Sequence, residues 1–378
     1  MKTIGLVAEY NPFHNGHLYQ INKIKALYPD SIIIVVISPT ITQRGELSLI
    51  NKYNKTKICL DNNIDIVIEL PTIFSMQSAD TFARGAITIL NKLNIDILVF
   101  GTEENDLSKL KEVASLQSKD TFNKEVKKYL DAGYNYPTSL SKVINDNLGY
   151  TITSPNDLLA ISYLKYLNKT ITPLNIKRTT SYNGLDIINN ITSATNIRKM
   201  LNSGKNIKHL IPSYDQNYIN NIDNQQLFNY LKYAIITNKD NLNKYVDVTE
   251  GIENRIIKSI NNTNNINDLI MNIKTKRYTY NRISRMLSHI LFDLKKDMVH
   301  NLNVDYIRVL GFTLQGQLYL NKAKKNIDIP IITGYKKNLS PLLDYELKIT
   351  SIYSLITKNN ILKEEYNKKP IIKKQKTS

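Results

Sequence analysis

Two histidines with two residues between them lie near the start of the chain, in the segment Glu-Tyr-Asn-Pro-Phe-His-Asn-Gly-His at residues 9–17. The segment follows an apolar run that predicts a strand and precedes a helical pattern. Pro12 ends the strand, and Gly16 lets the backbone approach a ligand. Free backbone N–H groups at a helix start favour a phosphate. His14 and His17 can both donate hydrogen bonds there, to an α-phosphate and its leaving pyrophosphate.

The same spacing has two other interpretations. The histidines could cap the helix, or they could hold a metal ion. Metal-binding pairs are more often four residues apart and need a further ligand elsewhere, and the chain has only three other histidines, His209, His289 and His300. We therefore favour the phosphate interpretation and predict no protein-held metal.

A parallel sheet would bring this segment and other loops to one edge. Runs rich in Ile and Val, typical of strands buried on both faces, occur at residues 3–8, 32–38, 64–70, 95–100 and 171–176. Helical patterns fill the gaps, so we predict an α/β fold with a doubly wound, Rossmann-like parallel sheet. Ligands bind outside the carboxyl ends of such strands, which selects the loops at residues 9–17, 39–45, 101–104 and 177–180.

The chain of 378 residues exceeds the size of one typical core. After about residue 205 strand patterns become sparse and helical patterns dominate. We therefore predict an α/β domain at residues 1–212, a mostly α-helical domain at residues 213–366, and a disordered, lysine-rich tail at residues 367–378.

The net charge is +17, from 50 Lys and Arg against 33 Asp and Glu. This excess suits a nucleic-acid partner, because cations neutralise phosphates and release counterions. A compositional bias toward Lys, Asn and Ile is the other explanation, so the position of the charge must decide.

The single cysteine, Cys59, excludes an intrachain disulfide, and its helical surroundings indicate a buried structural thiol. The chain begins directly with a strand pattern rather than a signal peptide, and no apolar run reaches the length of a membrane span. We therefore expect a cytoplasmic protein with no membrane partner.

The strongest basic cluster lies in the expected helical domain. Five cations, Lys274, Lys276, Arg277, Arg282 and Arg285, are interleaved with tyrosines at positions 278 and 280. On the helix expected to follow, apolar residues share one face, while Arg282, Arg285 and His289 share another. This pattern predicts an RNA-binding surface whose tyrosines stack on bases. A solvated face of an ordinary amphipathic helix is the alternative.

The His-Asn-Gly-His segment resembles the HxGH signature of the nucleotidyltransferase superfamily, whose members split ATP between the α- and β-phosphates. The usual companion motif, a helix start ending in arginine, has its counterpart in Thr-Ser-Ala-Thr-Asn-Ile-Arg at residues 192–198. In this position Ser193 or Thr195 would cap a helix, and Arg198 would neutralise β- and γ-phosphate oxygens.

A set of further motifs occurs in one order along the chain. They are VAEYNPFHNGHL at 7–18, QRGE at 43–46, DIVIELP at 65–71, FARGA at 82–86, FGTE at 100–103, SPNDL at 154–158, ENR at 253–255, KTKRYTY at 274–280 and YIRVLG at 306–311. Together they resemble the bacterial tRNA(Met) cytidine acetate ligase family over nearly the whole chain.

The resemblance implies a ligase that forms acetyl-adenylate and pyrophosphate from ATP and acetate, then acetylates N4 of the wobble cytidine of elongator tRNA(Met). It places ATP in the first domain, on Val7, Ala8, Glu9, Tyr10, Asn11, Pro12, Phe13, His14, Asn15, Gly16, His17, Leu18, Tyr19 and Gln20, with Gly101, Asn156, Arg178 and Arg198. His14 and His17 would be catalytic. A Mg²⁺ ion is expected to accompany ATP, but no carboxylate is assigned to it.

One loop departs from the family pattern. The family usually has a Ser-Gly-Asn/Asp-Phe type of loop before Gln-Arg-Gly, whereas this chain has Ser-Pro-Thr-Ile-Thr at residues 38–42. Pro39 removes an N–H group and fixes φ, which puts the specificity for the carboxylic acid in doubt. Two other functions stay open, a small-molecule nucleotidyltransferase and a non-catalytic RNA-binding protein that senses ATP. The oligomeric state stays open too.

Overall fold

Eight strands form one sheet in the computed structural model, which describes residues 1–178 and 184–374. They are β1 Thr3–Ala8, β2 Ile32–Ile37, β3 Ile66–Glu69, β4 Ile97–Thr102, β5 Thr172–Lys177, β6 Ile307–Thr313, β7 Ile331–Ile332 and β8 Ile371–Lys373. The order across the sheet is β5-β4-β1-β2-β3-β6-β7, with β8 also paired to β6. The five strands of the first half are all parallel, as predicted.

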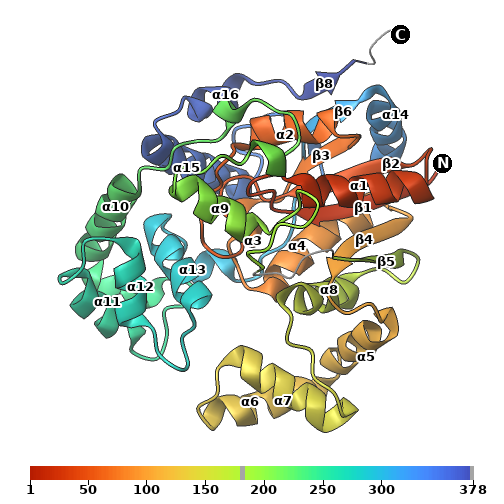
Figure 1. The fold of residues 1–378 in the computed structure, drawn as a ribbon. Coiled ribbons are helices and arrows are strands. Elements are labelled where there is room, and N and C mark those ends of the chain that lie inside the picture. The colour runs from red at the N-terminus through yellow and green to blue at the C-terminus, as the bar shows by residue number, and fades with distance from the viewer. Residues whose placement is uncertain (179–183, 375–378) are drawn as a thin grey trace.

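Helices cover both faces of this sheet (Figure 1). The first half carries α1 Asn15–Leu27, α2 Lys52–Asp61, α3 Thr72–Ser75, α4 Ala79–Lys92, α8 Pro155–Tyr166 and α9 Ala194–Asn202. The chain steps from β1 to β2 and β3 on one side, then returns past β1 to β4 and β5 on the other. Right-handed crossovers therefore place α1 and α2 on one face and α4 and α8 on the opposite face. The point where the direction reverses lies between β1 and β4, where ligands bind in open α/β sheets.

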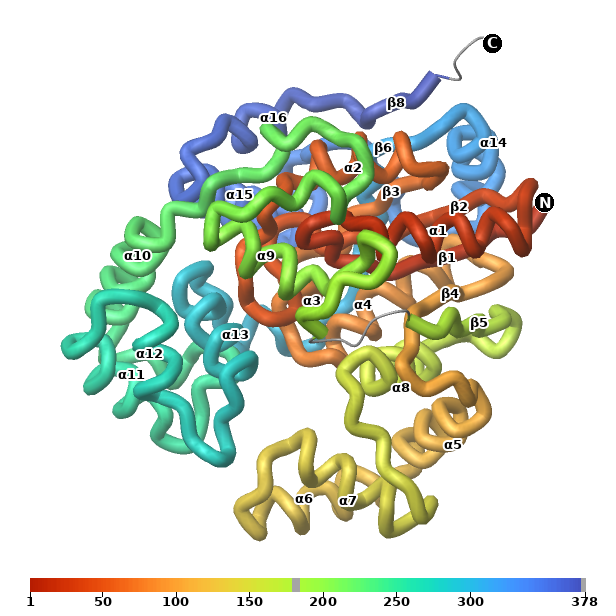
Figure 2. The backbone as a smooth tube through the Cα atoms, in the orientation of Figure 1, coloured from red at the N-terminus to blue at the C-terminus, as the bar shows by residue number. Residues whose placement is uncertain are grey.

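Three helices interrupt the sheet domain between β4 and α8, namely α5 Leu107–Gln117, α6 Asp120–Asp131 and α7 Tyr136–Leu148. The α6–α7 hairpin, residues 120–148, projects from the body of the molecule (Figure 2). We call this hairpin the arm.

A separate helical lobe follows the first half of the chain. It consists of α10 Asn224–Thr237, α11 Ile252–Ile260, α12 Ile266–Ile273 and α13 Tyr280–Leu291, which enclose their own apolar core. We call residues 224–291 the helical lobe. It contacts the sheet domain through α13, where the Ser288 hydroxyl donates to the carbonyl oxygen of Gly45 at 2.7 Å.

The last third of the chain differs from the sequence-based expectation. After the lobe, β6 returns to the sheet and pairs antiparallel with β3, flanked by α14 Leu314–Ala323, α15 Pro341–Thr357 and α16 Ile361–Asn367. This part of the expected mostly helical domain at residues 213–366 is also mostly helical, but β6 and α15 pack with the sheet and its core and not in a separate unit. Six of the seven β6 residues are buried, so the strand completes the core and covers the edge of β3.

The expected disordered tail at residues 367–378 is likewise wrong for its first part. Residues 371–373 form β8 on β6, and the Lys373 ammonium pairs with Asp61 at 3.3 Å. The last four residues of that prediction, 375–378, lie outside the described residues. Within the described ranges no helix combines the length and apolarity needed to cross a membrane.

Candidate active site

The loop between β1 and α1 is fixed through its own carbonyl groups. The Lys55 ammonium donates to the carbonyl of Glu9 at 2.6 Å, the Arg198 guanidinium to that of Asn11 at 2.9 Å, and the Tyr214 hydroxyl to that of Phe13 at 3.0 Å. The donors come from α2, from α9 and from the segment after α9. Three alternate carbonyls are therefore held from outside the loop, which sets the position at which α1 begins.

His14 and His17 form a reciprocal cap at the start of α1. The Nδ1 atom of His14 accepts from the Gly16 backbone at 3.0 Å, and the Nδ1 atom of His17 accepts from the His14 backbone at 3.2 Å. A Cβ atom on Gly16 would lie 2.8 Å from Cε1 of His14, so only glycine leaves room for this ring. The capping interpretation of the two histidines is thus confirmed, and it does not exclude the phosphate interpretation.

The cap leaves one donor on each ring. Burial lowers the pKa of His14 to about 3 and lowers that of His17 well below its ordinary value, with Arg178 adding to both effects. Both rings are therefore neutral near pH 7. Because each Nδ1 accepts, the proton sits on each Nε2. The ring centroids are 3.8 Å apart, so the loop presents two neighbouring Nε2–H donors, and neither has a hydrogen-bond partner within residues 1–178 and 184–374.

Arg198 lies beside these histidines as the companion motif predicts. Ser193 caps α9 by accepting from the Asn196 backbone, and the helix carries Arg198 to the loop. Besides the Asn11 carbonyl, the guanidinium contacts Glu46 at 3.1 Å. The neighbouring Arg44 donates to Thr195 at 3.2 Å. Two arginines therefore meet at the start of α9, next to the loop that carries the two histidines.

The remaining predicted residues meet at the end of β4. The stem of Arg178 lies against Gly101, since a Cβ atom there would be 3.4 Å from Cγ of the arginine. Glu103 connects the group, because its carboxylate accepts from the Asn156 amide at 2.6 Å and lies 3.6 Å from Nε of Arg178. Asp157 accepts from the Glu103 backbone at 2.9 Å and so fixes the turn.

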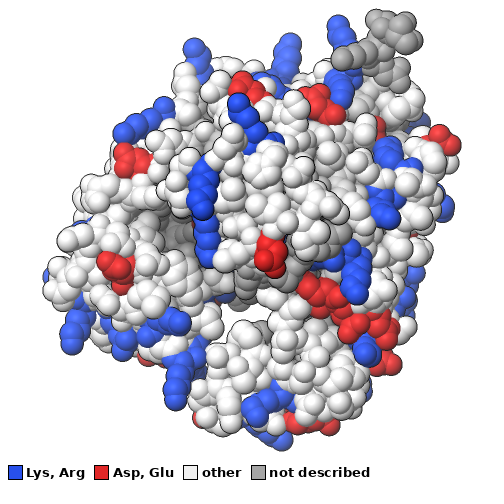
Figure 3. Space-filling view, in the orientation of Figure 1, with Lys and Arg blue, Asp and Glu red and all other residues white. Residues whose placement is uncertain are grey.

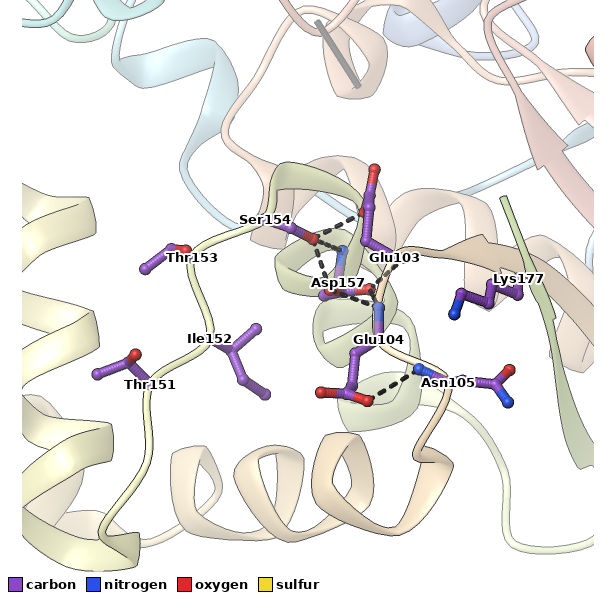
Figure 4. Close-up of a pocket in the computed structure, with 9 residues that line it drawn as sticks. All are labelled: Glu103, Glu104, Asn105, Thr151, Ile152, Thr153, Ser154, Asp157 and Lys177. Carbon is purple, nitrogen blue, oxygen red and sulfur yellow. Dashed lines mark hydrogen bonds between the residues drawn. The ribbon is translucent and has the colours of Figure 1, made fainter. Parts of the chain in front are cut away.

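The surface is hollowed next to this group (Figure 4). The hollow has a volume of about 280 Å³ and lies between the end of β4, Lys177 and residues 151–154, the segment that leads from the arm to α8. Ser154 closes one wall by donating to Glu103 at 2.7 Å. The segment that leads from the arm to α8 is therefore joined by a direct hydrogen bond to the loop that follows β4.

The other residues of the predicted ATP segment support the loop or lie on α1. Tyr10 and Phe13 are buried and pack edge to face, and Asn15 donates to the carbonyls of residues 190 and 209, which lie before and after α9. Val7, Ala8, Glu9, Asn11 and Pro12 form the strand end and loop, and Leu18, Tyr19 and Gln20 lie on α1 beyond His17.

Three further residues lie at this edge of the sheet that the sequence patterns did not identify as site residues, namely Lys55, Glu46 and Glu103. Lys55 is completely buried, and burial lowers its pKa to about 7. A lysine in a helical pattern normally indicates a solvated face, so nothing local signals this position. Glu46 and Glu103 stand inside the recognised motifs, and only the fold shows that they pair with Arg198 and Asn156. Cys59 is buried, as predicted.

The loop at residues 38–42, which departs from the family pattern, is entirely buried. The Ser38 carbonyl accepts from Lys55 at 2.8 Å, so this loop and the histidine loop share one lysine. The Ser38 hydroxyl is buried without a hydrogen-bond partner among the described residues. Pro39 therefore lies in a buried loop that supports the histidine loop through their shared lysine.

The basic cluster divides into exposed and buried members. Lys274 and Lys276 are exposed, Arg277 pairs with Glu250 at 2.7 Å, and Arg282 lies over the Tyr278 ring at 4.4 Å. The expectation of an exposed face is wrong for Arg285, whose side chain is 15% exposed and faces Asp247.

The same expectation is wrong for His289. Its ring is completely buried, with nitrogens 3.0 Å from the Val246 carbonyl and 2.8 Å from the Met76 carbonyl. Tyr278 is buried as well, whereas Tyr280 is 38% exposed. The second face of α13 packs against the sheet domain, which the amphipathic pattern does not reveal.

Comparison with known proteins gives a consistent result. A family model described as HIGH Nucleotidyl Transferase matches residues 1–369. The tRNA(Met) cytidine acetate ligase of Clostridium tetani is 33% identical, over 99% of this chain and 100% of the relative. The enzyme of the same name from Fusobacterium nucleatum is 39% identical, over 98% and 99%.

Solved structures agree. Apo Thermotoga maritima TmcAL superimposes with a TM-score of 0.88 at 26% identity, and the form bound with α-thio ATP with 0.86 at 27%. Each match covers 99% of this chain and 100% of the other. The chain therefore belongs to the HIGH nucleotidyl transferase family and, within it, to the tRNA(Met) cytidine acetate ligases.

Proposed function

We propose that this chain activates acetate with ATP and transfers the acetyl group to N4 of the wobble cytidine of elongator tRNA(Met). The observation that carries the proposal is the capped histidine pair, which offers two neutral Nε2–H donors at the point where the strand order reverses. The chain belongs to a family whose members are named for this reaction.

In the first step an acetate oxygen attacks the α-phosphorus of ATP, and the bond to pyrophosphate breaks. We assign His14 and His17 to the α-phosphate oxygens, where preorganised donors stabilise the charge of the transition state. Arg198 neutralises the β- and γ-phosphates. Its present partner Glu46 has a side chain that is 38% exposed, so it can turn toward solvent when the polyphosphate binds.

We assign the nucleoside end of ATP to the end of β4. Gly101 offers a flat backbone, Asn156 an amide for a ribose or adenine edge, and Arg178 a planar cation. In the second step the cytidine amine attacks the acetyl carbon. The C–N bond forms as the C–O bond to AMP breaks, and the amine releases one proton.

The carboxylates around the site are already engaged, which bears on the metal. Glu9 accepts from the Gln43 backbone at 2.6 Å, Glu46 pairs with Arg198, and Glu103 holds Asn156. We propose that Mg²⁺ enters with ATP and is held by phosphate oxygens.

Exchange of labelled pyrophosphate into ATP tests the first step. The exchange should depend on acetate and proceed without tRNA, because adenylate formation is reversible. Exchange that requires RNA would contradict a free acetyl-adenylate. Transfer of AMP onto a small product would favour the nucleotidyltransferase alternative, and ATP binding without turnover would favour a sensor.

A further inference from the structure

The insertion that contains α5 and the arm begins where β4 ends. It leaves the sheet after β4, which ends in Gly101 and Thr102, and returns through Ser154 to the start of α8. Both of its roots are joined by the bond from Ser154 to Glu103. An arm in this position is carried by the elements that would hold the adenosine.

The tip of the arm, residues 132–136, contacts residues 274–285 of the helical lobe, which we call the basic segment. The Asn135 amide at the tip donates to the Lys276 carbonyl at 3.3 Å. The same lobe reaches the loop that carries Glu46, the partner of Arg198, because the Ser288 hydroxyl on α13 donates to the carbonyl of Gly45 at 2.7 Å. The space-filling view shows the surface hollowed between the helical lobe, the arm and the body, with Lys and Arg side chains on the edge of the lobe (Figure 3).

The tip itself carries exposed aromatic rings beside cations. Tyr134 is 41% exposed and Tyr136 is 53% exposed. The Lys142 ammonium lies 4.8 Å from the centroid of the Tyr134 ring. Lysines at positions 119, 124, 127 and 128 are exposed along α6, and none of them forms an ion pair within the described part of the chain. Rings that stack on bases, combined with cations for the backbone, are the usual means of binding unpaired nucleic acid.

We propose that the arm tip is an RNA-binding element in which Tyr134 and Tyr136 stack on unpaired bases of the anticodon loop. The basic segment of the lobe contacts the backbone from the other side of the hollow, and the wobble cytidine reaches the histidine pair between them. The proposal rests on the proposed function, because it assumes that an unpaired cytidine must reach the adenylate. A paired stem offers no open base faces, so the surface selects a loop.

Direct binding to the full chain tests the arm independently of catalysis. We would measure the Kd of an unmodified elongator tRNA(Met) transcript for the parent and for Tyr134→Ala, Tyr136→Ala and the double variant. Each lost stacking contact should weaken binding about fivefold or more. Phenylalanine at either position should restore the affinity, because the ring and not the hydroxyl stacks. A fully paired RNA duplex of equal length should bind the parent and the variants alike.

Tyr233→Ala provides the matched control, because Tyr233 is a 69% exposed tyrosine on α10, outside the arm and the basic segment. It should leave the tRNA affinity unchanged. Acetate-dependent pyrophosphate exchange should stay at the parental rate in every arm variant, which separates this inference from the proposed function. Parental tRNA affinity in the double variant, an equal loss in Tyr233→Ala, or an equal loss for the duplex would overturn the proposal.

Discussion

The two histidines serve the fold and the proposed chemistry through different atoms. Each Nδ1 caps α1, and each Nε2–H is the donor that we assign to the α-phosphate. The roles can therefore be separated by substitution. Asparagine is a good N-cap residue, so His14→Asn keeps the capping acceptor and removes the Nε2 donor.

We expect His14→Asn and His17→Ala each to slow acetyl-adenylate formation by roughly 10²–10³, as loss of one oxyanion-type donor does. ATP affinity should change much less, because the donors act mainly on the transition state. Pyrophosphate exchange and equilibrium ATP binding measure the two quantities. A His14→Asn variant with a parental exchange rate would show that the histidines only cap the helix.

Acid should destabilise the protein through the same pair. The pKa of His14 is lowered to about 3, whereas an unfolded histidine titrates near 6.5. Between these values the unfolded chain binds more protons, so the free energy of unfolding falls as the pH drops below about 6.5, by up to about 1.4 kcal/mol per pH unit for each such histidine. Chemical unfolding at pH 7 and pH 5 should show a smaller loss for His14→Asn than for the parent. Equal losses would contradict a neutral, buried His14.

Much of the site could be predicted from sequence, because most of its motif residues lie in two short segments, residues 7–20 and 192–198. Lys55 does not follow, since its burial depends on the carbonyls of Glu9 and Ser38, which only the sheet brings to it. Glu46 and Glu103 show the same limit. Their partners are 152 and 53 residues away along the chain, and no local pattern specifies the pairing.

In helix α13 the amphipathic pattern correctly predicts the apolar face but not what the second face contacts. Its apolar face builds the core of the helical lobe, as the spacing predicts. Its second face is polar in sequence yet packs on the sheet domain, where a Cβ atom on Gly45 would lie 2.7 Å from the Arg285 backbone nitrogen. Periodicity identifies faces but not their neighbours, so Arg282 and Arg285 are expected to behave differently.

Arg282→Ala should weaken tRNA binding and leave the thermal midpoint unchanged. Its guanidinium stacks on Tyr278 near the surface, where a phosphate can reach it. Each lost phosphate contact should flatten the plot of log K against log salt by roughly 0.7–0.9. If the slope of log K against log salt is the same in the variant and the parent, Arg282 is a solvated surface residue that makes no phosphate contact.

Arg285→Ala should instead lower stability, because it leaves Asp247 without its partly buried partner and opens space at the contact between lobe and sheet domain. Thermal unfolding measures this effect. A stable Arg285→Ala variant with weakened tRNA binding would show that Arg285 binds tRNA and does not stabilise the contact between lobe and sheet domain.

In the molecule as a whole, helix α16 near the C-terminus is held to the sheet by buried ion pairs. Glu365 on α16 is buried against Lys52 at 2.8 Å and also pairs with Arg308 on β6. Lys52 contacts Glu69 on β3 at 3.0 Å. Residues separated by as many as 313 positions thus form one buried charge network. Sequence patterns cannot predict such a network, because each member alone resembles a surface charge.

Glu365→Ala should lower the free energy of unfolding by about 3–5 kcal/mol, because it leaves buried cations without their partner. The adjacent Glu364→Ala is the control. Glu364 forms a partly exposed pair with Lys368 one helical turn away, and loss of such a pair costs about 0.3–0.5 kcal/mol. Equal denaturation midpoints for the two variants would show that the network does not hold the C-terminus to the sheet.

We propose that one chain couples an ATP site on the sheet to an RNA surface on the arm and the helical lobe. Mass spectrometry of nucleosides tests it most directly, with elongator tRNA(Met) incubated with the protein, ATP and isotopically labelled acetate. We expect labelled N4-acetylcytidine at the wobble position, formed only when ATP is present and lost in His17→Ala. Unmodified cytidine under conditions where acetate-dependent pyrophosphate exchange proceeds would contradict it.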